Sequence, residues 1–293
     1  MANEEFLELI IRQEKPQACL SGPFDLSISL GNNITAKIHQ CGMRTISLST
    51  QKPLPSDLLF SIYHKLAKLL MLFDGMFYSV NSVLLKNNTS QFDQTTESLE
   101  NRLNYFQSKS FYTNLELLSF QNILTKDLFE KWCALLQDLD IAHQIFLYAL
   151  SDNTLPTDVN FAFLIELSEP FVELIKDKTP FFQSLSPGTR KTTLKNCIEA
   201  LIRDFGKDIF QKELAGDDSS FLSYLVKSRH RIMHIKKYQK PVFPSDCIPF
   251  YSMKFNLLYR RILLDLLGIS SNLYQFQLEK TIENINTRLS LIP

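Results

Sequence analysis

Two histidines and two arginines lie within six consecutive residues near the end of the chain, from Arg229 to His234. Histidine can donate and accept a proton near neutral pH. The planar guanidinium of arginine offers a fork of donors that fits a phosphate. The stretch from Lys227 to Lys240 carries six Lys or Arg residues and no acid. This concentration predicts chemistry on a phosphodiester, with RNA as the favoured substrate.

RNA carries its own nucleophile, because the 2′-hydroxyl can attack the neighbouring phosphate once a base removes its proton. His234 is the candidate acid or base, Arg229 is the candidate group for stabilising charge on the phosphoryl oxygens, and His230 is a second polar contact. No metal or other cofactor is needed. The residues expected to draw in the RNA, with a tyrosine available for base stacking, are Lys227, Arg231, Lys236, Lys237 and Tyr238.

Two other interpretations account for the same residues. Arg229 interrupts an apolar stripe formed by Leu222, Leu225, Val226, Ile232 and Met233, whose members are expected to pack in the core. A partly buried arginine needs a partner, so a salt bridge to an acid such as Glu169 or Asp265 would explain it. His230 and His234 are four residues apart and could hold a metal, but no third ligand is evident and the flanking cations would repel it.

The spacing of Arg229 and His234 raises a geometric difficulty. Five positions correspond to roughly 140° around an ideal helix, so the two side chains do not converge on one phosphate from a straight helix. Either the helix ends or bends near Met233, or two chains assemble the site. A two-fold dimer would bring two copies of the motif together across a cleft.

The composition bounds the class of protein. The chain has 293 residues, 45% hydrophobic and 21% charged, and only 8 glycines, which is typical of a soluble, mostly helical protein of one or two domains. Its net charge of zero requires any nucleic-acid contact to come from a local patch. Five scattered cysteines without a CxxC pair indicate reduced thiols, and neither a secretory signal nor a membrane span is evident. These features predict a cytoplasmic location.

The patterns predict an α+β chain that is mainly helical. Alternation predicts short strands within residues 24–49, which form a small β-hairpin or meander. A helix over about 56–80 and a polar loop or weakly packed helix over 86–103 are expected to follow. Residues 1–124 form the expected N-terminal region and residues 125–293 a helical domain. The helices expected there span 126–150, 161–175 with a kink at Pro170, 193–205, 221–235, 251–267 and 270–288.

The segment from Arg229 to His234 resembles the R-x4–6-H signature of HEPN domains. Its lead-in, residues 221–228, is similar to the family's LVxxRNxxxH pattern, and residues 251–269 are similar to the helix that follows it. Residues 129–150 and 164–169 resemble segments of ApeA-like HEPN proteins. The resemblance covers about residues 50–290 and is strongest after residue 125.

The resemblance implies a helical bundle that forms a homodimer and cuts RNA without metal. It also implies a role in anti-phage defence, abortive infection or a toxin–antitoxin system, with RNA (tRNA included) and an antitoxin or phage-derived trigger as partners. Arg229 and His234 correspond to the catalytic pair, His230 stands where the family usually has Asn or Asp, and Glu169 is a possible supporting residue. The N-terminal strand region is shorter than the family's sensor domain. A HEPN-like module that binds RNA or protein without cutting is the alternative.

Overall fold

The computed structural model describes residues 5–14, 23–31, 33–76, 78–87, 91–93, 115–151, 155–184, 193–216, 218–234 and 242–292. The chain divides into two compact units, Met1–Leu135 and Leu136–Pro293. The division falls inside helix α3 (Lys126–Leu150), later than the expected boundary between residues 124 and 125. Within the described ranges, no helix is long and apolar enough to cross a membrane.

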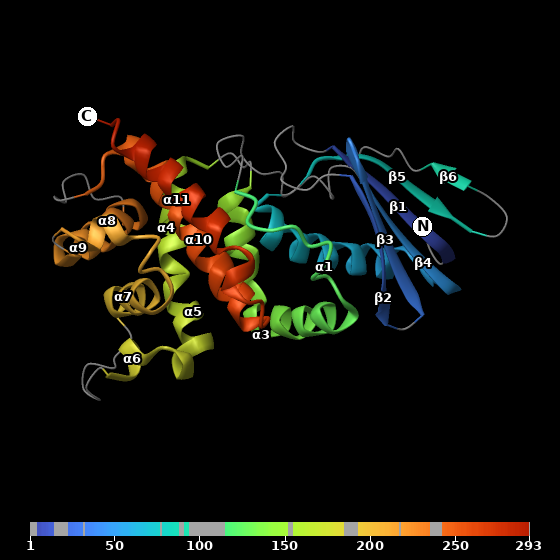
Figure 1. Cartoon of the computed structure of the whole chain (residues 1–293), viewed down its shortest axis with the longest axis horizontal. Helices are drawn as coiled ribbons and strands as arrows, with labels where there is room; N and C mark the ends of the chain where they lie inside the picture. Colours follow the sequence, from blue (N-terminus) through green and yellow to red (C-terminus); the bar gives the residue numbers. More distant parts are fainter. Residues whose placement is uncertain are drawn as a thin grey trace. The chain divides into compact units, whose positions relative to one another are not determined.

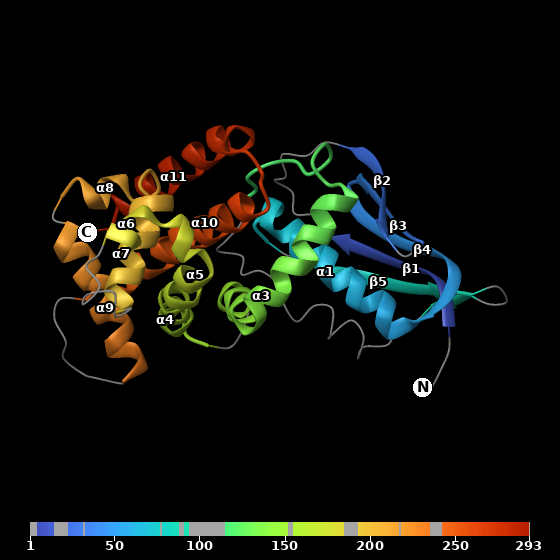
Figure 2. The ribbon, with the colours of Figure 1, turned by 90° about the horizontal axis from the view of Figure 1, so that it is seen from below.

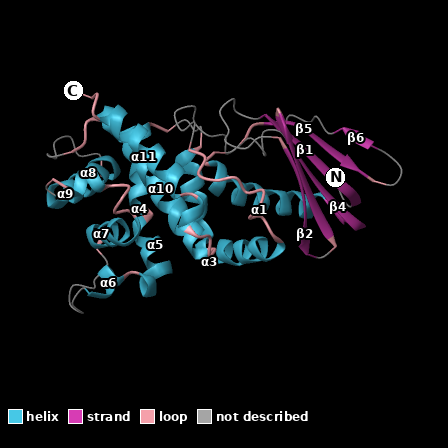
Figure 3. Ribbon diagram, in the orientation of Figure 1, coloured by secondary structure: helices cyan, strands magenta, loops and turns pink. Residues whose placement is uncertain are grey.

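The first unit contains an antiparallel sheet of six strands in the order β2-β3-β4-β1-β5-β6 (Figure 3). The expected strands within 24–49 are confirmed, but the sheet is much larger than the expected hairpin or meander. The strands span Glu5–Glu14 (β1), Phe24–Gly31 (β2), Ile34–Cys41 (β3), Met43–Pro55 (β4), Val80–Lys86 (β5) and Gln91–Asp93 (β6). Strand β6 lies in the segment expected to be a loop or weak helix.

Helix α1 (Ser56–Asp74) packs against one face of this sheet, next to β1 and β4 (Figure 2). Its buried side recurs at helical spacing, as at Leu59, Tyr63, Leu66 and Leu70. The helix ends at Asp74, not near residue 80, because Gly75 takes a left-handed conformation (φ 80°) and its N–H caps the Met71 carbonyl.

The regular elements that the structure describes in the second unit are all helices (Figure 1). Beyond the C-terminal part of α3, its helices are α4 (Thr157–Glu166), α5 (Ser168–Ile175), α6 (Pro180–Ser184), α7 (Leu194–Phe205), α8 (Gln211–Leu214), α9 (Asp218–Met233), α10 (Ile248–Leu266) and α11 (Gln275–Leu289). Short 3-10 turns occupy Lys176–Lys178, Ser245–Cys247 and Ser271–Leu273. The expected helices after residue 125 are therefore present, α3 with the expected bounds and the others with shifted ends.

One expected helix is divided in two. The pattern over 161–175 corresponds to α4 and α5, which meet at Leu167. Pro170 is the third residue of α5, where its missing N–H removes no intrahelical hydrogen bond. The chain therefore breaks before the proline, at Leu167. The expectation of one continuous helix kinked at Pro170 is wrong.

Helix α10 forms the centre of the second unit and packs against α4, α7 and α11. The hydroxyl of Tyr259 lies 2.5 Å from the Leu164 carbonyl oxygen, to which it donates, and 3.0 Å from the Ser168 hydroxyl. Because Leu164 and Ser168 flank the break between α4 and α5, this buried tyrosine fixes both helices against α10. Helix α4 in turn packs against α9, which carries the histidine and arginine cluster.

Candidate functional site

Helix α9 is anchored by its first two turns and becomes exposed towards its end. Leu222 and Leu225 are buried, as expected from the apolar stripe. Ser228 is also buried, and its hydroxyl accepts a 3.0 Å hydrogen bond from the Phe243 N–H. The expectation that Met233 packs in the core is wrong, because this side chain is 40% exposed. The last turn therefore presents its side chains outside the core.

Arg229 forms a salt bridge, but with a partner different from the two expected. Its Nη2 atom lies 2.5 Å from Oε2 of Glu166, the last residue of α4. Neither Glu169 nor Asp265 takes that position. The Arg229 side chain is 19% exposed, and its buried Nε has no hydrogen-bond partner among the described residues. The guanidinium is thus held at one edge by α4.

Glu169 belongs to the same charged cluster, although it does not pair with the guanidinium. Burial raises the pKa of Glu169, the negative charge of Glu166 raises it further, and the positive charge of Arg229 opposes both. The carboxyl groups of Glu166 and Glu169, which lie on either side of the break between α4 and α5, therefore both act on the Arg229 guanidinium. Cys197 on α7 is affected by the same acid, since burial first and Glu169 second raise its thiol pKa to about 11.

His230 and His234 lie against each other at the end of α9. Their ring centroids are 4.3 Å apart, with the ring planes at 53°. The helix ends at Met233, yet the His234 N–H still donates to the His230 carbonyl at 3.1 Å, which keeps His234 one turn beyond His230. The structure brings the two histidines together, whereas Arg229 is engaged with α4.

The expected RNA-binding residues are only partly within the described chain. Lys227 is half-buried and Arg231 is exposed, both on α9. Lys236, Lys237 and Tyr238 lie outside the described residues. Over the ranges that the structure describes, no three His, Cys, Asp or Glu residues are grouped so that they could hold a metal ion.

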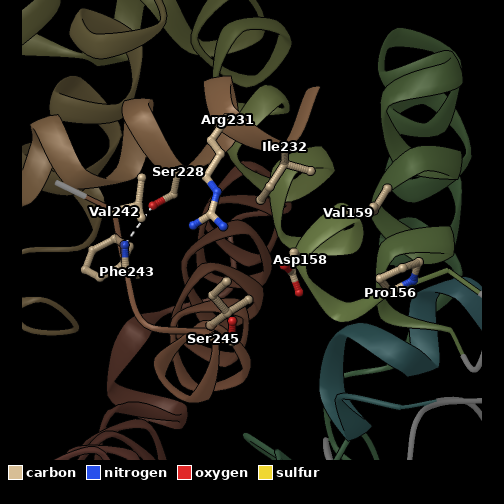
Figure 4. A pocket seen from close by; sticks show the side chains of 10 residues that line it. Pro156, Asp158, Val159, Ser228, Arg231, Ile232, Val242, Phe243 and Ser245 are labelled. Carbon is tan, nitrogen blue, oxygen red and sulfur yellow. Dashed lines mark hydrogen bonds between the residues drawn. The ribbon is translucent and has the colours of Figure 1, made fainter. Parts of the chain in front are cut away.

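A pocket of about 390 Å³ adjoins the end of α9 (Figure 4). The guanidinium of Arg231 points into it from α9, and Asp158 faces it from the first turn of α4. The remaining lining residues are Pro156, Val159, Ser228, Ile232, Val242, Phe243, Ser245 and Ile248. The pocket therefore offers one carboxylate and one guanidinium within mainly apolar walls.

Glu166 and Asp158 are the two residues that the sequence did not indicate. Both are single acids within or next to a segment expected to be helical. Glu166 lies in the segment 164–169 that resembles ApeA-like proteins, but no pattern in the sequence assigns a role to either acid. Their importance follows only from the packing of α4 against α9. The presence of a helix there could be predicted, but not the side of α9 that it covers.

Comparisons with protein-family models, with curated proteins and with solved structures found no match for this chain. The chemistry of the site is therefore argued from its residues. Two adjacent imidazoles can transfer protons in both directions, and guanidinium groups nearby can bind an anionic substrate.

Proposed function

We propose that this protein is a metal-independent endoribonuclease of the HEPN type, with the end of α9 as its active site. The observation that carries the proposal is the contact of His230 with His234, whose ring centroids are 4.3 Å apart in the last turn of α9. Arg229 stands in the same turn and adds a guanidinium to the two imidazoles. This set can supply both proton transfers and the cation that RNA cleavage requires.

The reaction begins when one imidazole removes the proton of the 2′-hydroxyl. The 2′ oxygen attacks phosphorus, the P–O2′ bond forms and the P–O5′ bond breaks. A protonated imidazole delivers a proton to the leaving 5′ oxygen. The products are a 2′,3′-cyclic phosphate and a 5′-hydroxyl, and no electron acceptor or metal is consumed. His234 acts as acid or base, and His230 assists as the second polar group.

Arg229 stabilises the charge that builds on the phosphoryl oxygens. In this role Glu166 is a positioning residue, because it holds the guanidinium through the 2.5 Å ion pair. Within one chain the Arg229 guanidinium is engaged by Glu166 at the end of α4. A homodimer that joins two α9 ends would supply the arginine of one chain to the histidines of the other.

A second function is favoured by one observation. The Arg229 guanidinium is only 19% exposed and already carries a carboxylate partner, so it can serve as a structural ion pair. The protein would then be a module that binds RNA or a partner protein through Lys227 and Arg231 without cutting. The net charge of zero is consistent with such local binding.

Incubation of the purified chain with tRNA and with total RNA separates the two functions. A nuclease shortens the RNA in the presence of EDTA, whereas a binding module shifts intact RNA on a native gel. If cleavage occurs only without EDTA, the proposal of a metal-independent reaction is wrong. In that case metal analysis of protein purified without a histidine tag tests His230 and His234 as ligands.

The proposed biological role is defence against phage or a toxin–antitoxin pair. RNA cleavage by an unrestrained enzyme arrests growth, so inducible expression in bacteria should be toxic. An antitoxin or a phage-derived trigger would control such an enzyme in its host. Wild-type expression without any growth defect, even though the purified protein cleaves RNA, would argue against this role.

A further inference from the structure

The pocket beside the end of α9 contains two opposite charges that are not paired with each other. Arg231 enters from α9 and Asp158 from α4 (Figure 4). Neither side chain forms an ion pair with any residue in the described part of the chain. The pocket thus presents a fork of donors and a pair of acceptors to whatever occupies it.

The walls of this pocket suit a flat ring. Val159 and Ile232 contribute apolar surface from the two helices, and Phe243 contributes an aromatic side chain. The Phe243 ring is fixed by contacts with Tyr251 and Tyr224, at centroid distances of 4.3 Å and 5.5 Å. The volume of about 390 Å³ lies in the range of small-ligand sites.

Guanine is the base that complements this arrangement of charges. Its N1–H and N2–H groups are neighbouring donors that a carboxylate such as Asp158 can accept together. Its O6 and N7 atoms are neighbouring acceptors that an arginine binds with two hydrogen bonds. Adenine places an acceptor at N1, which would face the carboxylate unfavourably, and uracil has a single donor on that edge.

We propose that the pocket bounded by Asp158 and Arg231 binds the guanine base of a nucleotide. The inference deepens the proposed nuclease and rests on it, because the pocket borders the last turn of α9, which also carries His230. Neither histidine lines the pocket, so the RNA strand would continue from the bound base around the end of α9 to reach them. Arg231 would then read a base and not only attract the RNA backbone. The enzyme would cut next to guanosine.

Equilibrium binding to the full-length chain tests the pocket without any need for cleavage. Calorimetric titration with 5′-GMP, 5′-AMP, 5′-CMP and 5′-UMP should show GMP binding about tenfold or more tightly than the others. Asp158→Asn replaces one acceptor by a donor and should remove this preference. Arg231→Ala should weaken GMP binding by a similar factor. Asp177→Asn and Arg288→Ala, at exposed sites, are matched controls that should bind GMP as the wild type does.

A second arm uses RNA, in order to separate a free nucleotide from a nucleotide within a strand. His234→Ala protein is titrated with a 12-residue single-stranded RNA that contains one guanosine, and with the same RNA carrying adenosine there. Tighter binding of the guanosine strand, lost in Asp158→Asn, supports base reading in RNA. A GMP preference without a strand preference would assign the pocket to a free nucleotide and contradict the inference about cleavage next to guanosine.

The two proposals fail in distinguishable ways. GMP preference that depends on Asp158, in a protein that leaves RNA intact, would refute the nuclease and retain the guanine pocket. RNA cleavage with equal binding of all four nucleotides would retain the nuclease and refute the pocket. Binding of GMP that is undetectable at millimolar concentration, or unchanged by Asp158→Asn, also refutes the pocket.

Discussion

The guanidinium Nη2 of Arg229 on α9 and the carboxylate Oε2 of Glu166 at the end of α4 are 2.5 Å apart. The contact links the proposed catalytic helix to its neighbour at a position where the helix dipole of α4 also favours a cation. The Glu166 side chain is 42% exposed although its Oε2 atom is buried, so water screens the pair in part and the free energy that it contributes to folding is small. Its main effect is to fix the orientation of Arg229.

Replacement of Glu166 by glutamine tests this orienting role. We expect Glu166→Gln to change the free energy of unfolding by less than about 1 kcal/mol. The same change should reduce RNA cleavage roughly 10- to 100-fold, because a misplaced catalytic group loses much of its effect. Glu199→Gln, which breaks the exposed pair with Arg203, is the matched control and should retain activity. Full activity in Glu166→Gln would show that the ion pair does not position Arg229.

The ionised carboxylate of Glu169 should lower the stability of the folded protein, whereas the ion pair of Glu166 contributes a small stabilisation. Burial and the neighbouring Glu166 raise the pKa of Glu169 above its usual value near 4.5. Between that value and the raised one, the folded state binds more protons than the unfolded state, so this group lowers stability as pH rises through the window. Glu169→Gln should therefore be more stable than the wild type at pH 7.

Denaturant unfolding at several pH values measures this difference. The advantage of Glu169→Gln should shrink as the pH falls from the raised pKa of Glu169 towards about 4.5, and it should be lost below that pH, where the carboxyl is protonated in both states. Glu173→Gln, which removes an exposed charge on α5 paired with Lys176 in the 3-10 turn that follows, should change stability by less than about 1 kcal/mol. An advantage of Glu169→Gln that is independent of pH would contradict the assigned cause.

The sequence predicts the long helices because their apolar residues recur locally. Helix α3 (Lys126–Leu150) has the predicted bounds, and α9 begins and ends within three residues of the prediction. Strand β1 was missed because its stability depends on distant partners. Leu9, for example, lies opposite Leu48 on one side and Leu85 on the other.

In the candidate site, too, local features could be predicted from the sequence, whereas contacts between distant residues could not. His230 and His234 could be placed together because both lie on one helix, four residues apart. A partner for Arg229 could be expected on general grounds, since buried charge is rarely unpaired. Its identity could not, because the packing of α4 against α9 decides which acid reaches the guanidinium. The role of Asp158 in the pocket could not be predicted either, because it also depends on how α4 packs against α9.

Breaking the buried pair of Arg44 and Asp74 should strongly destabilise the sheet unit. Two hydrogen bonds of 2.6 Å and 3.1 Å join the side chains, which are 2% and 3% exposed. Asp74→Asn leaves the arginine charge buried without its counterion and should cost about 3–5 kcal/mol. Asp25→Asn, which loses only an exposed contact with His39, should cost less than about 1 kcal/mol. Equal losses in the two variants, measured by urea unfolding, would contradict the account.

Tyr259 should make the helical unit sensitive to alkali. Burial raises the pKa of its hydroxyl far above the usual value near 10, although the Ser168 hydroxyl opposes the shift. Above about pH 10 the unfolded state loses this proton while the folded state keeps it, so stability falls as pH rises. Tyr259→Phe should lose about 1 kcal/mol at neutral pH for the missing hydrogen bond to Leu164.

In the same variant, the decline in stability above about pH 10 should be shallower than in the wild type. Urea unfolding between pH 8 and pH 11 measures both slopes. Tyr63 and Tyr251, whose pKa values burial also raises, should leave part of the decline in place. Parallel pH profiles for wild type and Tyr259→Phe would show that Tyr259 does not contribute to it.

Sequencing of RNA ends after inducible expression tests the central claim most directly. Wild type is compared with His234→Ala and Arg229→Ala, with Arg288→Ala as an exposed arginine control, and each variant is checked for folding by circular dichroism. We expect new 5′-hydroxyl and 2′,3′-cyclic phosphate ends, together with growth arrest, in the wild type and Arg288→Ala only. Cleavage at the wild-type rate in both folded His234→Ala and Arg229→Ala proteins would contradict the assignment of the end of α9 as a ribonuclease site.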